Sequence, residues 1–276
     1  MQTVVITGGT DGLGKGLALH YLRQGAHVIA VGSTAEKGQA LLAEAKALPT
    51  GRADFVRSDL TSVAASQDLA ERLAGDHPVV DKLILCAQRY RLFGDRVTTR
   101  EGFEHSFALA YLSRFVLSHG LHDALRAARR PVIMNVGTPG VPLGRIHWDD
   151  LQLTRTYSGA KASLQSFRAN DLLGVAFGVL HAGSGVSYIG YNPGVVSTGM
   201  PESLPQPLRA ATKAFFTMFA TSVPKAIAPM TALLDDPPAE PFAAYWQKRR
   251  LSLDGRAFDG QDALRLHDLT RELIPR

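Results

Sequence analysis

The chain has 276 residues, 45% of them hydrophobic, and a formal net charge of +5 at pH 7. This length suffices to bury the core of one domain, and the mild, scattered charge argues against a nucleic-acid partner. With Cys86 as the only cysteine, no apolar run near the roughly 20 residues of a membrane helix, and a strand directly after Met1, we expect a cytoplasmic protein without disulfides, metal or membrane partner.

The first 31 residues have the pattern strand, glycine-rich turn, helix, strand. Residues 2–7 are an apolar, β-branched run typical of a strand buried on both faces, and residues 27–31 repeat that pattern after a helical stretch that Gly25 closes. Glycine at such a turn lets the backbone approach a phosphate, toward which the free N–H groups of the following helix point. The pattern therefore predicts an anion-binding β-α-β unit.

Residues 7–14 read Thr-Gly-Gly-Thr-Asp-Gly-Leu-Gly, which resembles the T-G-x-x-x-G-x-G turn of the short-chain dehydrogenase/reductase family. The alternative is that the glycines only make a tight connection. The resemblance implies a doubly wound sheet that binds a nicotinamide dinucleotide. The cofactor-binding residues expected in this turn are Gly8, Thr10, Asp11, Gly12, Leu13 and Gly14.

The second strand ends without a carboxylate. An acidic residue there would accept hydrogen bonds from the adenosine ribose and repel a 2′-phosphate. The chain offers Ser33, Thr34 and Lys37 instead, ahead of a helix that either Ser33 or Thr34 caps. We therefore expect NADP(H) to be favoured over NAD(H), although Ser33 acting only as a cap would suit either cofactor.

The third and fourth strands are expected at residues 53–56 and 79–85, with a helix at 63–73 between them. The resemblance implies that Asp59, with Leu60 beside it, contacts the adenine; the alternative is that Asp59 only begins the helix. The fourth strand ends Cys86-Ala87-Gln88-Arg89. The family usually has Asn-Asn-Ala-Gly at residues 85–88, and this chain keeps only Ala87 of that motif, which we expect to contact the cofactor.

Residues 98–125 are largely helical in pattern, with aromatic residues from Phe103 to Phe115 at four-residue steps, which is typical of a core face. The family places in this helix an asparagine that helps to hold a water of the proton relay. By register that position falls on Ala110, whose side chain cannot hydrogen-bond. The change predicts lower turnover, a relay carried by water, or different chemistry.

The predicted catalytic residues follow the fifth strand, residues 131–136. Thr138 matches the family serine that hydrogen-bonds the substrate carbonyl, although it could merely cap the strand end. Tyr157 and Lys161 have the Tyr-x-x-x-Lys spacing, which on a helix places them one turn apart on the same face. We expect the lysine to lower the tyrosine pKa, and the resemblance implies that Tyr157 donates the proton while Lys161 also binds the ribose.

A sixth strand, residues 186–191, leads into a loop that resembles the family's P-G-x-V-x-T segment. Pro193, Gly194, Val196 and Thr198 match it and would hold the nicotinamide carboxamide. Residues 200–229 are rich in apolar and small residues, which suits a substrate lid. A helix is expected from 229 to 234, a final strand around 245–253, and a helix over 260–274.

Together these features predict one α/β domain over residues 1–276, a doubly wound, Rossmann-like parallel sheet. The resemblance implies an NADP(H)-dependent oxidoreductase of the ketoreductase or alcohol dehydrogenase type, acting on an apolar, bulky substrate, in a homodimer or homotetramer. Two alternatives remain: a lyase, isomerase or cyclase that does no redox chemistry, and a nucleotide-binding regulator without turnover.

Overall fold

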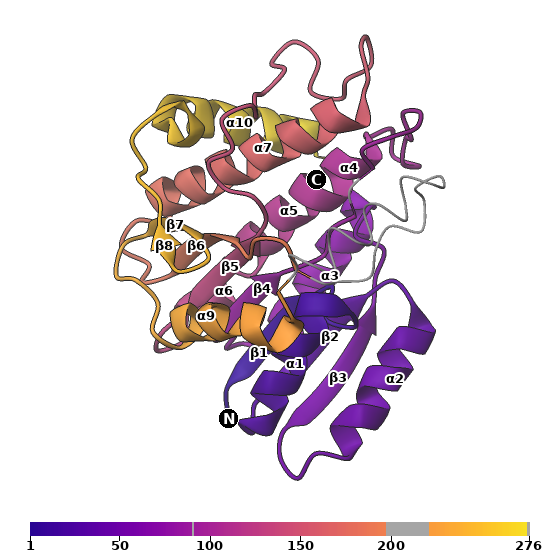
Figure 1. Ribbon diagram of the computed structural model, residues 1–276, viewed down its shortest axis with the longest axis vertical. Coiled ribbons are helices and arrows are strands. Elements are labelled where there is room, and N and C mark those ends of the chain that lie inside the picture. Colours follow the sequence, from indigo (N-terminus) through magenta and orange to yellow (C-terminus); the bar gives the residue numbers. More distant parts are fainter. Residues whose placement is uncertain (90, 197–220, 275–276) are drawn as a thin grey trace.

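The computed structural model describes residues 1–89, 91–196 and 221–274, and within them the strands form one eight-stranded sheet (Figure 1). The strand order is β3-β2-β1-β4-β5-β6-β7-β8, with all neighbours parallel except β7 and β8. The chain reverses its direction of travel across the sheet between β1 and β4, which confirms the predicted doubly wound topology. The strands are β1 (Thr3–Thr7), β2 (His27–Gly32), β3 (Arg52–Arg57), β4 (Lys82–Leu85), β5 (Val132–Val136), β6 (Ser187–Asn192), β7 (Phe242–Trp246) and β8 (Arg249–Arg250).

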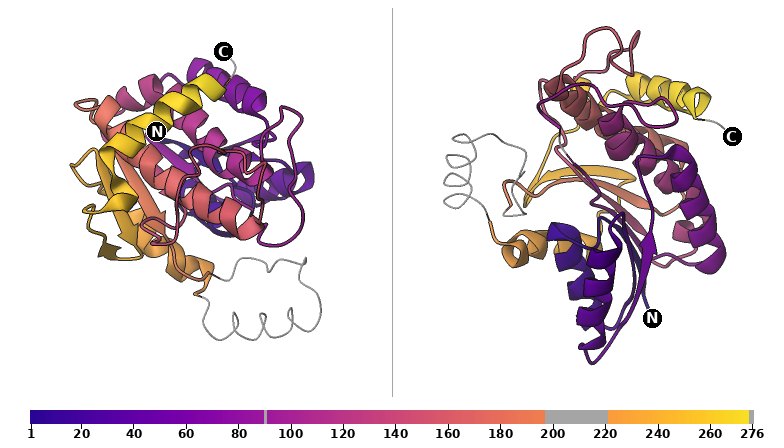
Figure 2. Two further views of the ribbon diagram at one scale, coloured as in Figure 1. Left: turned by 90° about the horizontal axis from the view of Figure 1, so that it is seen from above. Right: turned by 90° about the vertical axis from the view of Figure 1, so that its right-hand side faces the viewer.

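Helices cover both faces of the sheet, as the side view in Figure 2 shows. On one face, α1 packs against α2 and α9; on the other, α3 packs against α5, while α7 lies beside them under the C-terminal helix α10. The helices are α1 (Gly12–Arg23), α2 (Ala35–Lys46), α3 (Val63–Asp76), α4 (His105–Phe107), the π-helix η1 (Ala108–Leu112), α5 (Ser113–Gly120), α6 (His122–Arg126), α7 (Gly159–Leu180), α9 (Val223–Asp235), the short 3-10 helix η2 (Arg256–Phe258) and α10 (Gly260–Leu273).

The central strands are mainly apolar because both of their faces are covered. Val4 and Ile6 belong to the core under α1 and α9, whereas Val5 between them belongs to the core under α3, α5 and α7. All three side chains are fully buried, and burial of such a side chain contributes roughly 1.5–3 kcal/mol. The sheet is thereby a rigid support for the loops at the carboxyl ends of its strands.

The predicted helix over residues 98–125 begins later and is interrupted. Thr98 pairs with Glu104 in an isolated bridge, and the Glu104 carboxylate caps α4 by accepting a hydrogen bond from the Phe107 N–H, at 2.7 Å. The helical path then passes through η1, which contains Ala110, and breaks again at Leu121. A π-helix inserts an extra residue into a turn, and such insertions are common at functional sites.

Two expectations about the C-terminal third need correction. The helix expected from Pro229 begins at Val223, because Pro224 falls in the first turn, where its missing N–H costs no hydrogen bond. Residues 223–229 of the expected lid therefore belong to α9, which packs on α1, and residues 200–220 lie outside the described part. The single final strand is instead the antiparallel pair β7 and β8.

Candidate active site

The turn between β1 and α1 has the shape that the glycine pattern predicts. Gly8 has φ +66°, and a Cβ there would lie 2.9 Å from the backbone nitrogen of Ala87. A Cβ on Gly14 would lie 2.2 Å from the carbonyl oxygen of Gly8, so the start of α1 sits directly on the turn. These two glycines let β1, the turn and α1 pack closely at the carboxyl edge of the sheet, as a phosphate-binding turn requires.

Asp11 is the N-cap of α1, and its Oδ1 accepts a hydrogen bond from the Gly12 N–H at 2.8 Å. Its other carboxylate oxygen accepts one from the Lys37 ammonium, and this bond holds the Asp11 pKa below its ordinary value. Both side chains are more than half exposed, so the pair itself contributes little stability. The two predicted cofactor residues are brought together, but as partners of each other.

The end of β2 lies beside the end of β3, where Gly32 is in register with Arg57. Thr34 is the N-cap of α2, which selects it over Ser33 for that position, although its side chain makes no capping bond. Arg57 donates from Nε to the carbonyl oxygen of Ser33, at 3.2 Å. This arginine is a site candidate that sequence analysis missed; pairing the last residues of adjacent predicted strands would have revealed it.

Asp59 does not begin a helix, since the N-cap of α3 is Ser62. Its Oδ1 accepts hydrogen bonds from Thr61, from the backbone N–H at 3.0 Å and from the hydroxyl at 2.7 Å. The Leu60 side chain is only 5% exposed and lies in the core, so only its backbone can face a ligand. The adenine contact of Asp59 stays a prediction.

The strand ends that follow β4 and β5 lie next to the glycine turn. The Ala87 N–H donates to the Thr7 hydroxyl at 3.2 Å, which places the Ala87 backbone against the end of β1. Thr138 follows β5 by two residues and is partly buried, and the intervening Gly137 N–H donates to the Tyr191 carbonyl oxygen at 2.8 Å. Thr138 therefore lies at the same sheet edge as the turn, with its neighbour fixed to β6.

Tyr157 is not on the helix, as the spacing had suggested. It precedes Ser158, the N-cap of α7, whose hydroxyl accepts a hydrogen bond from the Lys161 N–H at 3.2 Å. The Tyr157 hydroxyl makes a long hydrogen bond of 3.5 Å to Oε1 of Glu104, and the Lys161 ammonium donates to the Thr156 hydroxyl at 3.2 Å. No hydrogen bond joins the phenol directly to the lysine.

The electrostatics of Tyr157 also differ from the expectation of a lowered pKa. Partial burial raises the pKa of the phenol first, and the Glu104 carboxylate raises it further, because both disfavour the phenolate. Glu104 itself is 1% exposed. The phenol is protonated at neutral pH, as an unperturbed tyrosine is, and the raised pKa makes it a weaker acid than an unperturbed tyrosine.

Ala110 lies in η1 with its side chain buried, and its carbonyl oxygen accepts a hydrogen bond from Asn170 Nδ2, at 2.7 Å. Asn170 Oδ1 in turn accepts from Asn135 Nδ2 at 2.8 Å. An asparagine amide of α7 thus lies beside the position where the resemblance expects a helix asparagine. The catalytic consequence of Ala110 stays a prediction.

The loop after β6 is described as far as Val196. The Gly194 N–H donates to Asn192 Oδ1 at 2.8 Å, and Gly194 has φ +74°, so a glycine is required at this turn. Val196 is buried and bridges to Thr221. With Pro193 these residues lie at the carboxyl end of β6, whereas Thr198 lies outside the described residues.

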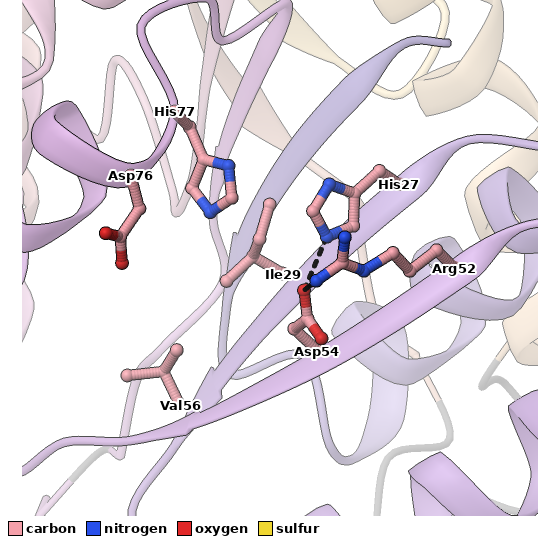
Figure 3. A pocket seen from close by; sticks show the side chains of 7 residues that line it. All are labelled: His27, Ile29, Arg52, Asp54, Val56, Asp76 and His77. Atoms are coloured by element: carbon pink, nitrogen blue, oxygen red, sulfur yellow. Dashed lines mark hydrogen bonds and ion pairs between the residues drawn. The ribbon is translucent and has the colours of Figure 1, made fainter.

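A hollow of about 430 Å³, whose lining side chains Figure 3 shows, lies at the amino ends of β2 and β3, away from the candidate site. His27 and Arg52, the first residues of β2 and β3, line it together with Asp54 and His77. Both His27, at 2.6 Å, and Arg52, at 3.0 Å, contact Asp54 Oδ2, so these charges are already paired. This hollow is therefore separate from the candidate site.

Residues 1–89, 91–196 and 221–274 contain no cluster of three or more histidine, cysteine or acidic side chains placed to hold a metal ion. None of the helices described there is long and apolar enough to span a membrane.

Comparison with known proteins agrees with this geometry. Residues 2–209 match the family model of the short chain dehydrogenases. A protein of Streptomyces sp. (strain C5), provisionally named daunorubicin C-13 ketoreductase DnrU, is 30% identical over 253 residues, which are 91% of this chain and 84% of that protein. Polyprenol dehydrogenase of Danio rerio is 31% identical over 223 residues, 78% of this chain and 68% of that protein.

Among solved structures, a short chain dehydrogenase from Burkholderia cenocepacia J2315 in complex with NADP has the same fold. It superposes with a TM-score of 0.66 at 18% identity and covers 89% of this chain and 95% of its own. The fold, the glycine turn and the sequence relatives lead to one conclusion. The chain belongs to the short-chain dehydrogenase/reductase family and is an oxidoreductase of that family.

Proposed function

We propose that this protein is an NADP(H)-dependent ketoreductase or alcohol dehydrogenase that acts on an apolar, bulky carbonyl or carbinol. The observation that carries the proposal is that Tyr157 and Lys161, at the start of α7, lie at the same sheet edge as the tight turn of Gly8 and Gly14. The names of two relatives, a daunorubicin C-13 ketoreductase and a polyprenol dehydrogenase, support a carbonyl or alcohol substrate.

The residues fit a bound dinucleotide. Gly8 and Gly14 allow β1, the turn and α1 to pack closely, because a Cβ on either would collide with the neighbouring backbone, and the first turn of α1 offers its free N–H groups to a phosphate. The nicotinamide, when bound, supplies or accepts the hydride. Lys161, whose ammonium is held by the Thr156 hydroxyl, would bind the ribose at the first turn of α7.

In the reduction, Tyr157 passes its proton to the carbonyl oxygen as that oxygen gains negative charge. Thr138 donates a hydrogen bond to the same oxygen and polarises it. The Lys161 ammonium stabilises the phenolate that the proton transfer leaves behind, and it offsets the unfavourable effect of the Glu104 carboxylate on that phenolate. These roles together make a general-acid site.

The preference for NADP(H) rests on the residues at the end of β2. Ser33 and Thr34 offer hydroxyls, and Arg57 and Lys37 offer cations, for a 2′-phosphate. Asp11 works against the preference for NADP(H), because its carboxylate already accepts a hydrogen bond from the Lys37 ammonium. We expect NADPH to bind more tightly than NADH, with Arg57 as the cation that is not paired to Asp11.

One observation favours a second candidate, a family member without redox turnover. Tyr157 contacts Glu104 instead of Lys161, and Ala110 has no side chain to hold a relay water. A lyase, isomerase or cyclase could use the same protonated phenol as its acid. The homodimer or homotetramer and the cytoplasmic location stay predictions.

The deciding experiment follows reduced nicotinamide by its near-ultraviolet absorbance with a panel of apolar ketones and aldehydes, once with NADPH and once with NADH. We expect NADPH to be consumed with at least one bulky apolar ketone, and calorimetric titration to give the lower dissociation constant for NADPH. Substrate conversion without consumption of either cofactor would favour the non-redox candidate. Tighter NADH binding would contradict the cofactor assignment alone.

A further inference from the structure

Arg114 is the largest side chain that the fold buries completely, with 2% of it exposed. It projects from α5, in the turn that follows η1, to the carboxyl ends of β4 and β5. Burying a guanidinium is unfavourable unless its N–H groups are hydrogen-bonded. The contacts of the guanidinium must therefore explain why it is buried beneath the candidate site.

The contacts of Arg114 join two segments of chain. NH1 donates to Asn135 Oδ1 and, at 2.9 Å, to the Val136 carbonyl oxygen, both at the end of β5. NH2 donates to the Ala87 carbonyl oxygen at 3.1 Å and to Gln88 Oε1 at 3.4 Å, both just past the end of β4. All four acceptors are neutral oxygens, and one planar side chain reaches all of them.

The two segments need such a connection. The ladder between β4 and β5 ends with Leu85 opposite Asn135, so past that pair no backbone hydrogen bond between these two strands fixes their separation. Gln88 is also one of the three positions, with Leu85 and Cys86, at which this chain departs from the Asn-Asn-Ala-Gly sequence of its family. The guanidinium replaces the missing ladder bonds with side-chain bonds.

Each segment leads directly to a site residue. Ala87 donates to the Thr7 hydroxyl, and its nitrogen would lie 2.9 Å from a Cβ on Gly8, so its backbone supports the phosphate turn. On the other side, a Cβ on Gly137 would lie 3.6 Å from Arg114 NH1, and Thr138 is the next residue. Movement of the guanidinium would shift both the cofactor turn and the predicted carbonyl-binding hydroxyl.

We propose that Arg114 is a positioning residue, which ties the ends of β4 and β5 together and thereby holds the Ala87 backbone against the cofactor turn and Thr138 over the substrate. This inference rests on the proposed function for the identity of the bound molecules. The tie itself depends only on the contacts of the guanidinium. The two parts can therefore be tested separately.

The test uses Arg114→Met, which removes the donors, and Arg114→Lys, which keeps the charge but cannot span both segments. The matched control is Lys82→Met. Lys82 is likewise a buried cation with 2% exposure, but it lies at the first residue of β4 and donates to the Leu234 carbonyl oxygen, at 2.5 Å. Lys82 is as buried as Arg114, but it lies at the amino end of β4, whereas Arg114 contacts the residues that follow the carboxyl end of that strand.

The first measurement is hydrogen exchange of the Ala87 and Gly137 amides, both of which have acceptors in the parent. We expect at least tenfold faster exchange of both in each Arg114 variant, and unchanged exchange in Lys82→Met. The second is titration with NADPH by fluorescence, for which we expect at least tenfold weaker binding in Arg114→Met and a change of less than twofold in Lys82→Met.

Unchanged exchange at Ala87 and Gly137 in Arg114→Lys would overturn the tie, and that variant decides the matter if Arg114→Met fails to fold. Faster exchange with an unchanged NADPH dissociation constant would make the tie purely structural and overturn the positioning role. A parent protein that binds no NADPH would instead refute the proposed function, while the exchange measurement would still decide the tie.

Discussion

We expect the protein to lose stability as the pH falls, and replacing His119 should remove a large part of that loss. His119 on α5, His122 on α6, His181 after α7 and His267 on α10 form one cluster of imidazoles. His119 Nδ1 and His181 Nε2 are 3.0 Å apart, and the rings of His122 and His181 are stacked at 3.9 Å. The cluster also holds α10 against the layer below, since the His119 and His267 rings are 5.0 Å apart.

Burial first, and then the neighbouring imidazoles His267, His181 and His122 with Arg271, lower the pKa of His119 to about 3. The unfolded chain takes up this proton near pH 6.5, whereas the folded protein does so only at much lower pH. Stability is therefore complete above pH 6.5 and is lost as pH falls toward 3. Between pH 6.5 and 5 the loss is about 2 kcal/mol, at about 1.4 kcal/mol per pH unit.

His181 adds to this loss in the same direction, because burial also lowers its pKa, to about 4. Its contribution is smaller than the pKa suggests, since the ring is partly exposed and solvent screens its charge. Buried Asp171 acts in the opposite direction, because burial raises its pKa to about 8. The comparison must therefore be between variant and parent at each pH.

The assay is urea unfolding of the parent and of His119→Phe at pH 7.5 and pH 5. We expect the parent to lose about 2 kcal/mol more than the variant between these values. His20→Gln serves as control, since His20 lies on α1 away from the cluster and should remove a smaller share of the loss. Equal pH dependence in the parent and His119→Phe would refute the reasoning.

Two further predictions concern the site. Ala110→Asn should leave kcat/KM equal or higher, because the amide restores a group that can hold a relay water. A roughly tenfold fall in kcat/KM with the fold intact would count against a simple reductase. Such a fall would mean that the buried amide finds no partner, which costs about 1–3 kcal/mol. Arg57→Met should weaken binding of 2′,5′-ADP by roughly tenfold and leave 5′-AMP nearly unchanged, since a charge-assisted bond to one phosphate contributes about 1.5–3 kcal/mol. Calorimetric titration with both nucleotides decides the second, and equal losses would remove Arg57 from the phosphate site.

The strands and the glycine turn could be predicted because their signals are local. Residues 4–6 and 28–31 are apolar without interruption because helices cover both faces of β1 and β2, and the spacing from Gly8 to Gly14 fixes the turn. The aromatic stripe from Phe103 to Phe115 is buried as expected. What failed locally was the start of α7, because Ser158 caps the helix after Tyr157 and not before it.

The contacts that define the site are between residues far apart in the sequence. Glu104 and Tyr157 are 53 residues apart, and Arg114 reaches Ala87 across 27. No periodicity in the sequence indicates such pairs, so the raised pKa of Tyr157 and the burial of the Arg114 guanidinium could not be predicted. Arg57 was within reach of sequence reasoning, because parallel pairing of β2 with β3 brings the two strand ends together.

The central claim, that Tyr157 is the proton donor of a nicotinamide-dependent carbonyl reduction, is tested most directly by Tyr157→Phe. The variant loses only the hydroxyl that contacts Glu104. We expect reduction of the best ketone of the panel to fall by a factor of roughly 10² to 10⁴, with the NADPH dissociation constant close to that of the parent. Retention of more than about half of the reductase activity would contradict the account, because the loss of a general acid should have a far larger effect.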